Sequence, residues 1–459
     1  MAVKAVVLGA GEGTRMKAII PKVIHKLAGR PMILWVLGAV ARLEPVQTVV
    51  VVKPAADQVR AVLPATVTPV VQERQLGTAH ALQVALDVIS LDPGDQVLVV
   101  PADTPLVTSE TLKRTATLHR RTGSAGTCIT ANMDDPTGYG RVVRDGWDRV
   151  RRIVEHTDAT TREREIKEIN GGIYMFDGDL IRDAVEHVGR NNAQGEYYLP
   201  DVLAILGTEG HSISAYRTDA EELSGVNTQD QLAQVAAIMR NRINETWMRS
   251  GVWMQDPSRV YIDSTVCLDA GVLLYPGVHV EGSTTIASGA EIGPDVHIRD
   301  SRIGSGAKVW YSVLREVSVG ENVEIGPYAS LRPGAELLDG SKAGTFVEVK
   351  NSVVGKGAKV PHLAYVGDAE IGDESNVGAG TITANYNGFE KHRTKVGRRV
   401  QVGSNTVLVA PVEVGDDAYI GAGSTITRKV SEGALGIERS PQREISGYAH
   451  RRRLRHELG

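Results

Sequence analysis

The sequence predicts an α/β domain with a parallel sheet, followed by a linker helix and a parallel β-helix of stacked coils. Three observations support this fold class. Aliphatic runs alternate with helix-like stretches in the first half of the chain, apolar residues recur at helical spacing over residues 228–250, and aliphatic residues recur every six positions over much of residues 260–430. Each period is typical of one kind of backbone, so the chain is expected to change architecture along its length.

The first element is a short apolar run over residues 4–8, which predicts a central parallel strand. It ends in the sequence GAGEGTRM of residues 9–16. This is neither a dinucleotide-binding fingerprint, which needs a glycine in place of Thr14, nor a Walker A loop. Glycines still let backbone N–H groups approach phosphates, and a strand-to-helix turn adds the field of a helix N-terminus. With Arg15 and Lys22, the loop predicts a phosphate-binding site.

Further strands are expected over residues 48–52 and 96–100, separated by helical stretches such as residues 79–89. This alternation is typical of a parallel sheet covered by helices. Ligands bind such sheets at the carboxyl ends of the strands, and Asp103 follows one of these ends. Its carboxylate either holds a hard cation such as Mg²⁺ or caps the next helix, and its position alone leaves both open.

The linker helix is expected over residues 228–250, because the apolar residues there recur at helical spacing. They are Leu232, Val235, Ala236, Met239, Ile243 and Trp247. Such a stripe indicates packing rather than a ligand-binding face.

A repeat of six residues dominates the second half. Six is neither a helical nor a simple strand period, and a fixed short repeat is typical of a parallel β-helix. One inward aliphatic side chain is expected in each short strand, with a tight corner between strands. Two unbroken series carry the repeat: Ile262, Leu268, Leu274, Val280, Ile286, Ile292 and Ile298, and later Val396, Val402, Leu408, Val414, Ile420 and Ile426.

The repeat is broken at two places. It is disturbed between residues 338 and 353, and it is left altogether between residues 382 and 396, where an external loop is expected. Insertions in solenoids form loops on one face and often bind ligands. His362 is either a solvated corner residue or a general base, because imidazole can take a proton from an amine near neutral pH. Polar and charged residues gather near these places: Arg332, Lys350, His362, Tyr365, Asn376, Asn385, Tyr386 and Lys391.

Composition limits the class of protein. With 459 residues, 42% of them apolar and 23% charged, the chain is long enough for two or three soluble domains. It has no apolar run of the ~18–20 residues that a membrane span needs, no secretory signal, and only two distant cysteines, so a cytoplasmic protein without a membrane partner is expected. The net charge of −4 argues against nucleic-acid binding. The basic segment 450–456 is either a solvated terminus or an arm that meets phosphate or an acidic neighbour.

The strings LGAGEGTRM, PKVIHKLAGRPM, QLGTAHA, ADTPL, DDPTGYGR, EINGGIY, NNAQGEYYLPD and GVN follow one another along the first half. They resemble the sugar-nucleotidyltransferase family. The later strings RPGAEL, GTFVEVK, HLAYVGDAEIG, NVGAGTITANYNG and LVAPVEVG resemble the acetyltransferase half of its bifunctional members. The resemblance runs essentially end to end. It implies a Rossmann-like nucleotidyltransferase domain over residues 1–227, a linker helix over 228–250, and a left-handed β-helix acetyltransferase domain with a C-terminal arm over 251–459.

The resemblance implies two reactions. In the first, glucosamine 1-phosphate receives an acetyl group from acetyl-CoA. In the second, which depends on Mg²⁺, the N-acetylglucosamine 1-phosphate so formed receives a uridylyl group from UTP, and pyrophosphate is released. The product, UDP-N-acetylglucosamine, serves bacterial cell-wall synthesis. The resemblance also implies a homotrimer, with the acetyl-transfer site between subunits.

For uridylyl transfer the resemblance implies that Arg15 and Lys22 are the catalytic cations that neutralise the phosphates. Asp103 and Asn227 are implied to hold the magnesium. The implied nucleotide and sugar contacts are Leu8, Gly9, Ala10, Gly11, Lys22, Gln72, Gly77, Thr78, Pro101, Ala102, Asp103, Gly140, Glu155, Asn170 and Asn227. The sequence departs from the family pattern at Gly9, Glu12, Pro101, Ala102 and Gly171. Phosphoryl transfer needs positioning and charge neutralisation more than covalent chemistry by the protein, so these residue types fit the reaction.

For acetyl transfer the resemblance implies that His362 is the catalytic general base. The expected contacts with glucosamine 1-phosphate are Arg332, Lys350, Tyr365, Asn376 and Lys391. The implied contacts with acetyl-CoA are Ala379, Asn385, Tyr386, Ser404, Ala422 and Arg439.

Two alternatives to a bifunctional enzyme remain open from the sequence. A nucleotidyltransferase whose β-helix only oligomerises or regulates would not need His362 or the NYNG loop of residues 385–388. A non-catalytic scaffold would not need the cations and oxygens of the uridylyl-transfer site. Release of CoA in the absence of UTP distinguishes the first alternative from the bifunctional enzyme.

Overall fold

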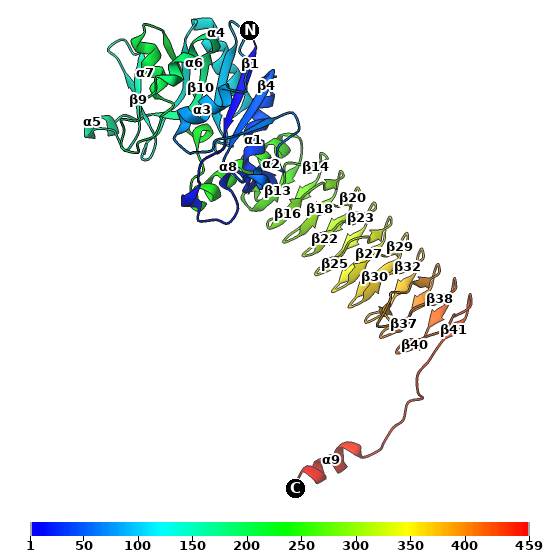
Figure 1. Ribbon diagram of the computed structural model, residues 1–459. Helices are drawn as coiled ribbons and strands as arrows, with labels where there is room; N and C mark the ends of the chain where they lie inside the picture. Colours follow the sequence, from blue (N-terminus) through cyan, green and yellow to red (C-terminus); the bar gives the residue numbers. More distant parts are fainter. Residues whose placement is uncertain (1, 458–459) are drawn as a thin grey trace. The chain divides into compact units, whose positions relative to one another are not determined.

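The computed structural model describes residues 2–457. The chain forms two compact units, and the boundary between them falls between Arg242 and Ile243. Figure 1 shows a sheet with helices around it in the first unit and rows of short stacked strands in the second. Helix α8 (Gln229–Arg249) runs across the boundary. Within the described residues, no helix is long and apolar enough to cross a membrane.

A mixed sheet of nine strands forms the centre of the first unit. Strand β1 (Val3–Leu8) is parallel to β4 (Gln47–Val52) and β6 (Gln96–Pro101), as expected. Strand β10 is antiparallel to β6 and β7, and the hairpin of β8 (Arg141–Arg144) and β9 (Val150–Val154) pairs beside it, so antiparallel strands are added to the expected parallel ones and the sheet is mixed. The main path runs in the order β11 (Ile213–Arg217), β7 (Gly126–Asn132), β10 (Glu168–Asp177), β6 (Gln96–Pro101), β1 (Val3–Leu8), β4 (Gln47–Val52) and β5 (Thr68–Val71).

Helices cover both faces of this sheet, because successive residues of a strand point to opposite sides. Val6 lies in one hydrophobic core, with side chains of α3, α6 and α7. Ala5 and Val7 lie in the other, with side chains of α1 and α4. The unit is therefore a Rossmann-like α/β layer structure. Its helices are α1 (Met32–Ala41), α2 (Asp57–Arg60), α3 (Thr78–Leu86), α4 (Ser109–Thr122), α5 (Thr161–Arg164), α6 (Gly178–Glu186) and α7 (Asp201–Thr208).

The glycine loop after β1 does not lead into an α-helix, contrary to expectation. It contains a single 3-10 turn over Thr14–Met16, and a second turn follows over Lys22–Ile24. Gly13 and Lys17 flank the first turn with left-handed backbone, at φ 67° and φ 47°. Left-handed residues at both ends stop a helix from propagating beyond one turn. The phosphate-binding character of the loop therefore depends on its backbone and its cations, without a helix dipole.

Three parallel sheets of eleven, ten and nine strands form the second unit. The first strands of the three sheets are β12 (Trp253–Met254), β13 (Val260–Ile262) and β14 (Cys267–Leu268). The six-residue repeat places its aliphatic side chains in line, since Ile262 pairs with Val280 and Val280 pairs with Ile298. All three are buried in one continuous core. The predicted β-helix and its inward positions are confirmed.

Of the two expected breaks in the repeat, one is confirmed and one is wrong. Residues 338–353 stay within the coil, because β27 (Lys342–Thr345) pairs with β24 (Glu324–Ile325) and β28 (Glu348–Lys350) pairs with β25 (Ser330–Leu331). The small Ala343 occupies an inward position there, where the repeat usually has a larger aliphatic residue, so the repeat is not visible in the sequence at this coil. The external loop lies between β34 (Ile382–Ala384) and β35 (Thr394–Val396), and its Phe389 is 94% exposed.

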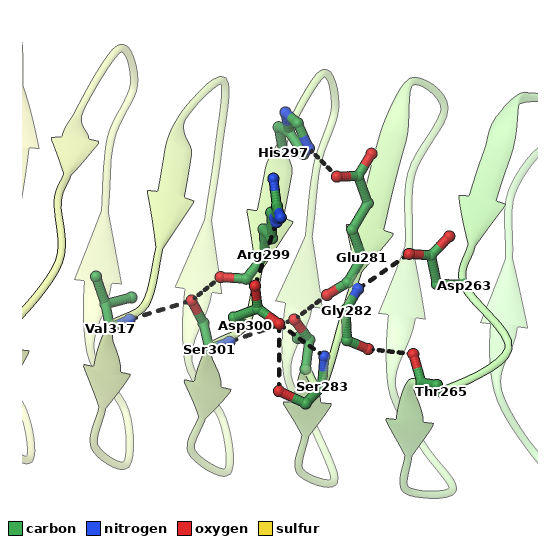
Figure 2. A network of polar contacts seen from close by, with 11 residues as sticks. Asp263, Thr265, Glu281, Gly282, Ser283, His297, Arg299, Asp300, Ser301 and Val317 are labelled. Carbon is green, nitrogen blue, oxygen red and sulfur yellow. Dashed lines mark hydrogen bonds and ion pairs between the residues drawn. The ribbon is translucent and has the colours of Figure 1, made fainter. Parts of the chain in front are cut away.

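A second inward position lies two residues before each inward aliphatic, and the sequence did not reveal it. Thr284 and Ser301 occupy it and are buried. Figure 2 shows the hydroxyl of Ser301, which donates to Arg299 O at 2.7 Å. In the same network Asp300 accepts from the backbone N of Ser283, in the previous coil, at 3.0 Å. Such bonds satisfy the buried hydroxyls and join neighbouring coils at one corner.

The last turns of α8 pack on the first coil of the β-helix. Asn244 is fully buried, and its Nδ2 donates to Pro257 O at 2.7 Å and to Val260 O at 2.9 Å. The side chains of Ile243, Trp247 and Met248 pack against the apolar core of the coils. The apolar stripe of this helix therefore serves packing, as expected.

Candidate active sites

A cavity of about 390 Å³ lies at the carboxyl ends of β1 and β6, where parallel sheets bind ligands. Ala102 and Gly140, expected as contacts, do not line it, and neither do Arg15 and Asn227. The expected nucleotide and sugar contacts that do line it are Leu8, Gly9, Ala10, Gly11, Lys22, Gln72, Gly77, Thr78, Pro101, Asp103, Glu155 and Asn170.

Two glycines fix the wall of this cavity. Gly9 N donates to Val51 O at 2.8 Å, and a Cβ at Gly9 would lie 3.1 Å from the same oxygen. Gly77 is the N-cap of α3, with φ 120°, and a Cβ there would lie 2.4 Å from Tyr197 O. A larger residue at position 77 would clash with this backbone, so glycine is required there.

Four side chains form a polar cluster at the end of β6. Lys22 Nζ forms an ion pair with Asp103 and donates to Asn227 Oδ1 at 3.0 Å. Arg15 Nη2 donates to the same Asn227 oxygen at 3.0 Å. Asp103 O accepts from Val226 N at 2.9 Å, and this backbone bond brings the segment of Asn227 to the end of the strand. The structure thus joins residues separated by more than 200 positions along the chain.

The two oxygens of this cluster suit a hard cation. Asp103 Oδ2 and Asn227 Oδ1 contact a single ammonium group, so they converge on a place where a cation can lie. Residues 2–457 contain no group of three or more His, Cys, Asp or Glu side chains able to hold a metal. A Mg²⁺ ion at this place would complete its coordination with water and phosphate oxygens, as is usual for this ion.

Glu155, Asn170 and Tyr174 line the far end of the cavity. Asn170 Nδ2 donates to Tyr174 Oη at 2.7 Å, and Asn170 N donates to Gly140 O at 2.9 Å, which holds Gly140 against this end. Burial raises the pKa of Glu155, and two neighbouring carboxylates raise it further. Burial also raises the pKa of Tyr174 well above its ordinary value, so its hydroxyl keeps its proton at neutral pH.

Gln72 and Thr78 are tied to the cavity wall by their own side chains. Gln72 is buried, and its Nε2 donates to Gly77 O at 3.1 Å and lies 2.9 Å from His80 Nδ1. Thr78 Oγ1 accepts from Leu199 N at 3.0 Å. Both side chains therefore have fixed orientations before any ligand binds.

Other residues do not behave as the sequence suggested. Ala102 is fully buried in the hydrophobic core, and its backbone N donates to Leu8 O at 2.9 Å. Glu12, one of the departures from the family pattern, lines the cavity. Sequence reasoning also missed some lining residues, although the motifs EINGGIY and NNAQGEYYLPD contain most of them: Gln75, Tyr174, Glu196, Leu199 and Pro200.

In the second unit His362 lies at a corner between two sheets, at the end of β30 (Lys359–His362). It is exposed and pairs along the stack with Thr345. In the next coil Gly380 N donates to His362 O at 3.4 Å, and Asn405 N donates to Ala379 O at 2.7 Å. The same register continues through the following coils. Four of the expected residues therefore lie one above another at this corner: His362, Ala379, Ser404 and Ala422.

Three cations gather at the next corner of the coils, where Arg332 follows β25 and Lys350 ends β28. Leu331 pairs with Val349, so Arg332 and Lys350 lie in register on neighbouring coils. The close contact of Lys391, followed by burial and the charge of Arg332, lowers the pKa of Lys350. Arg332 Nη1 also forms an ion pair with Glu348 at 2.7 Å. The external loop thus brings Lys391 close to Arg332 and Lys350. Three neighbouring cations of this kind can bind a phosphate group.

Asp368 holds the base of the external loop. It is 7% exposed and accepts from Nδ2 of both Asn351 and Asn385. Burial by itself raises the pKa of Asp368, but these amides and the charges of Lys350 and Lys391 lower it overall. The loop therefore begins from an ionised, fully bonded anchor.

The remaining expected residues are more scattered. Tyr365 lies on β31 (Tyr365–Gly367), and its Oη accepts from Asn385 Nδ2 at 3.4 Å. Asn376 is half-buried on β33 (Asn376–Val377), whereas Tyr386 is exposed in the external loop. Arg439 Nη1 donates to Ala422 O at 2.8 Å. Within residues 2–457 His362 makes no side-chain hydrogen bond, so nothing described in this chain links it to the cations.

The chain matches two protein-family models: the MobA-like NTP transferase domain over residues 5–167, and the bacterial transferase hexapeptide (six repeats) over residues 393–428. Bifunctional protein GlmU of Streptomyces coelicolor is 46% identical over 454 residues, which cover 98% of this chain and 94% of that protein. The protein of the same name from Thermoanaerobacter pseudethanolicus is 45% identical over 446 residues, which cover 97% of both chains. The chain therefore belongs to the bifunctional GlmU family, as an enzyme that joins a nucleotidyltransferase and an acetyltransferase in one polypeptide.

Proposed function

We propose that the chain makes UDP-N-acetylglucosamine in two steps. The β-helix domain, residues 251–459, transfers an acetyl group from acetyl-CoA to glucosamine 1-phosphate. The N-terminal domain, residues 1–227, then transfers the uridylyl group of UTP to the N-acetylglucosamine 1-phosphate. Residues 228–250 join the two domains. UTP and acetyl-CoA are cytoplasmic metabolites, so the cytoplasm is the proposed location.

The cluster of Arg15, Lys22, Asp103 and Asn227 at the cavity is the observation that carries the uridylyl-transfer proposal. A phosphate oxygen of the sugar phosphate attacks the α-phosphorus of UTP, and the bond from that phosphorus to the bridging oxygen of pyrophosphate breaks. Magnesium, when bound by Asp103 and Asn227, neutralises and orients the phosphates. Arg15 and Lys22 offset the negative charge that builds up on the leaving pyrophosphate.

The rest of the cavity positions the two substrates. The Leu8–Gly11 backbone and the fixed side chain of Gln72 hold the nucleotide at one end. Glu155 and Asn170 hold the sugar at the other, with Gly140 behind them. Positioning of this kind contributes much of the rate in phosphoryl transfer, which needs no nucleophile from the protein.

The corner of His362 supports the acetyl-transfer proposal. His362 takes a proton from the amine of glucosamine 1-phosphate, the amine nitrogen attacks the thioester carbonyl, and the C–S bond breaks to release CoA. The proton then passes to the leaving sulfur. Arg332, Lys350 and Lys391 hold the sugar phosphate, with Tyr365 and Asn376 beside them. Acetyl-CoA lies along the corner column and loop formed by Ala379, Asn385, Tyr386, Ser404, Ala422 and Arg439.

A homotrimer completes this site in our proposal. An exposed column of Tyr311, Tyr328, Phe346 and Leu363 supports self-association, because its residues are 40–63% exposed and apolar or aromatic. Ring centroids lie 5.6 Å apart between Tyr311 and Tyr328 and 5.3 Å apart between Tyr328 and Phe346. Another copy of the same β-helix offers side chains at the same coil spacing. Leu363 follows His362 directly, so a second copy on this column would lie beside the acetyl-transfer site.

Two assays on the same preparation test the proposed function. With acetyl-CoA and glucosamine 1-phosphate but no UTP, the protein should release one CoA thiol for each amine acetylated. With UTP, Mg²⁺ and N-acetylglucosamine 1-phosphate, it should release pyrophosphate. Pyrophosphate without any CoA release would reduce the β-helix to a structural part.

A further inference from the structure

Lys22 occupies the place that the proposed function gives to a metal ion. Its ammonium contacts both proposed ligand atoms, Asp103 Oδ2 and Asn227 Oδ1, the second at 3.0 Å. The side chains of Lys22 and Asp103 are only 11% and 22% exposed. Within residues 2–457 the Asp103 carboxylate has no second ion pair. This anion is therefore neutralised by one internal cation.

An ammonium and a magnesium ion cannot share these two oxygens. A lysine ammonium is a compact charge that donates along three directions, and here two of its contacts are these oxygens. Magnesium binds carboxylate oxygens at short range and demands near-octahedral geometry. The two cations would also repel each other strongly in a site that is mostly shielded from water.

A bound nucleotide would offer Lys22 a second anionic partner. Lys22 lines the cavity beside Leu8, Gly9, Ala10 and Gly11, the segment that faces the phosphates in the proposed function. A triphosphate there gives the ammonium new oxygens in place of those of Asp103. Among the described residues Arg15 bonds through its side chain to Asn227 and not to Asp103, so Lys22 is the cation paired with that carboxylate.

We propose that Lys22 is a place-holder for the metal. When nucleotide and metal bind together, the Lys22 ammonium leaves Asp103 and Asn227 and moves to the phosphates. This inference rests on the proposed uridylyl-transfer function. It assigns one side chain two successive partners in the same cavity. Because a buried carboxylate without a partner is costly, the lysine also keeps Asp103 ionised and oriented until the metal replaces it.

Metal and nucleotide should therefore bind with positive coupling. Metal alone must displace a shielded ion pair, whereas metal that arrives with a triphosphate finds the lysine already engaged elsewhere. Linkage makes the effect reciprocal, so UTP strengthens metal binding by the same factor by which metal strengthens UTP binding.

Mn²⁺ binding to the full-length protein without nucleotide tests this inference, with electron paramagnetic resonance to count the free ion. Removal of the place-holder in Lys22→Met should lower the Kd for Mn²⁺ by ~10-fold or more relative to the unaltered chain. Lys22→Gln should also lower the Kd for Mn²⁺, and it serves as the test variant if the methionine variant folds poorly. Lys26→Met removes an exposed cation nearby in sequence and should leave the Kd unchanged. Adding Asp103→Asn to Lys22→Met should abolish the tighter binding of Mn²⁺. This loss would show that the ion binds at Asp103.

The outcomes separate this inference from the function on which it rests. A tighter Kd in the Lys22 variants, lost with Asp103→Asn, supports the place-holder. An unchanged Kd in both Lys22 variants, together with weaker Mn²⁺ binding by Asp103→Asn in the presence of UTP, overturns the place-holder and keeps the metal site. If Asp103→Asn changes neither measurement, the proposed metal site itself is wrong. Thermal unfolding curves establish that each variant is folded.

Discussion

Asn385 donates its side-chain amide to the carboxylate of Asp368, and this contact fastens the external loop to the coil before it. Asp368 accepts a second amide from Asn351, so both of its oxygens are used. Its pKa is lowered in the folded protein. The contact therefore contributes stability at all pH values above the ordinary carboxyl value of about 4 and loses that contribution as the pH falls through the lowered value.

The first prediction concerns this anchor. Asp368→Asn replaces an acceptor for two amides by a group with only one oxygen, so one amide is left unpaired. The loop should then open, with a local cost of about 2 kcal/mol. Limited proteolysis should cut residues 385–393 faster, and acetyl transfer should fall by roughly tenfold while uridylyl transfer is kept. Asp373→Asn, at a more exposed corner where Lys356 N donates to the carboxylate, is the matched control. An intact loop in Asp368→Asn would contradict this reading.

His362→Ala should abolish acetyl transfer and leave uridylyl transfer within a factor of about two. A positioned general base contributes roughly 10²- to 10⁴-fold. The exposed His362 makes no side-chain hydrogen bond to the described part of the chain, so its loss should not disturb the coil. Measuring CoA release and pyrophosphate release on one preparation checks that acetyl transfer is lost while uridylyl transfer is kept. Equal loss of both activities would make His362 a structural residue.

Asp103→Ala should have the opposite effect. It removes a proposed metal ligand and leaves Lys22 with only Asn227, so magnesium-dependent pyrophosphate release should fall by about 10²-fold or more. Acetyl transfer is proposed for the other unit and should persist. Titration of the residual activity with Mg²⁺ provides the check, and an unaltered magnesium dependence would remove Asp103 from the metal site.

Tyr174→Phe tests the far end of the cavity. The buried hydroxyl accepts from Asn170 Nδ2 and keeps its own proton for a ligand, so its loss frees Asn170 and removes one donor to the sugar. The KM for N-acetylglucosamine 1-phosphate should rise by roughly tenfold, which corresponds to the loss of one hydrogen bond of about 1.4 kcal/mol. The KM for UTP should change much less. Tyr216→Phe, which lies outside the cavity, is the control, and an equal rise in both KM values would refute the assignment.

Phe346→Ser tests the proposed contact between copies. The side chain is 57% exposed and stacks only on Tyr328 within the described chain, so its loss should cost the isolated β-helix little. Light scattering after gel filtration should show a smaller assembly, with acetyl transfer reduced and uridylyl transfer retained. Val313→Ser, also exposed on a coil but outside the column, should leave the mass unchanged. A trimer that survives in Phe346→Ser would exclude this column as the contact.

The sequence predicted the architecture well where a period repeats. Each inward aliphatic of the hexads marks a strand, and Ile262, Val280 and Ile298 stack as their spacing requires. The second inward position is apolar in many coils, as at Val260, Val266 and Val272, but the polar Thr284 and Ser301 interrupt this series and obscure it. Their hydroxyls are satisfied by nearby backbone, so the burial of these residues leaves no apolar signal in the sequence.

The direction of the strands and the local turns could not be predicted from the sequence. The run EINGGIYMFD of β10 has the same composition whichever way the strand points, so its antiparallel pairing could not be inferred. At the site, Lys22 and Asp103 were found because charges beside a glycine loop and at a strand end are unusual. Tyr174 was missed because an aromatic residue within a strand usually belongs to a core, and its hydroxyl becomes informative only when Asn170 is seen beside it.

The seating of Asn244 and its apolar neighbours on the first coil has a practical meaning for anyone who shortens this chain. A stack of identical coils has no intrinsic stop, and a bare terminal coil offers free strand edges to another molecule. A fragment that begins at residue 251 would lose Ile243, Asn244, Trp247 and Met248 together. Such a fragment should grow into fibres end to end, whereas one that begins at residue 229 keeps the helix that blocks this growth.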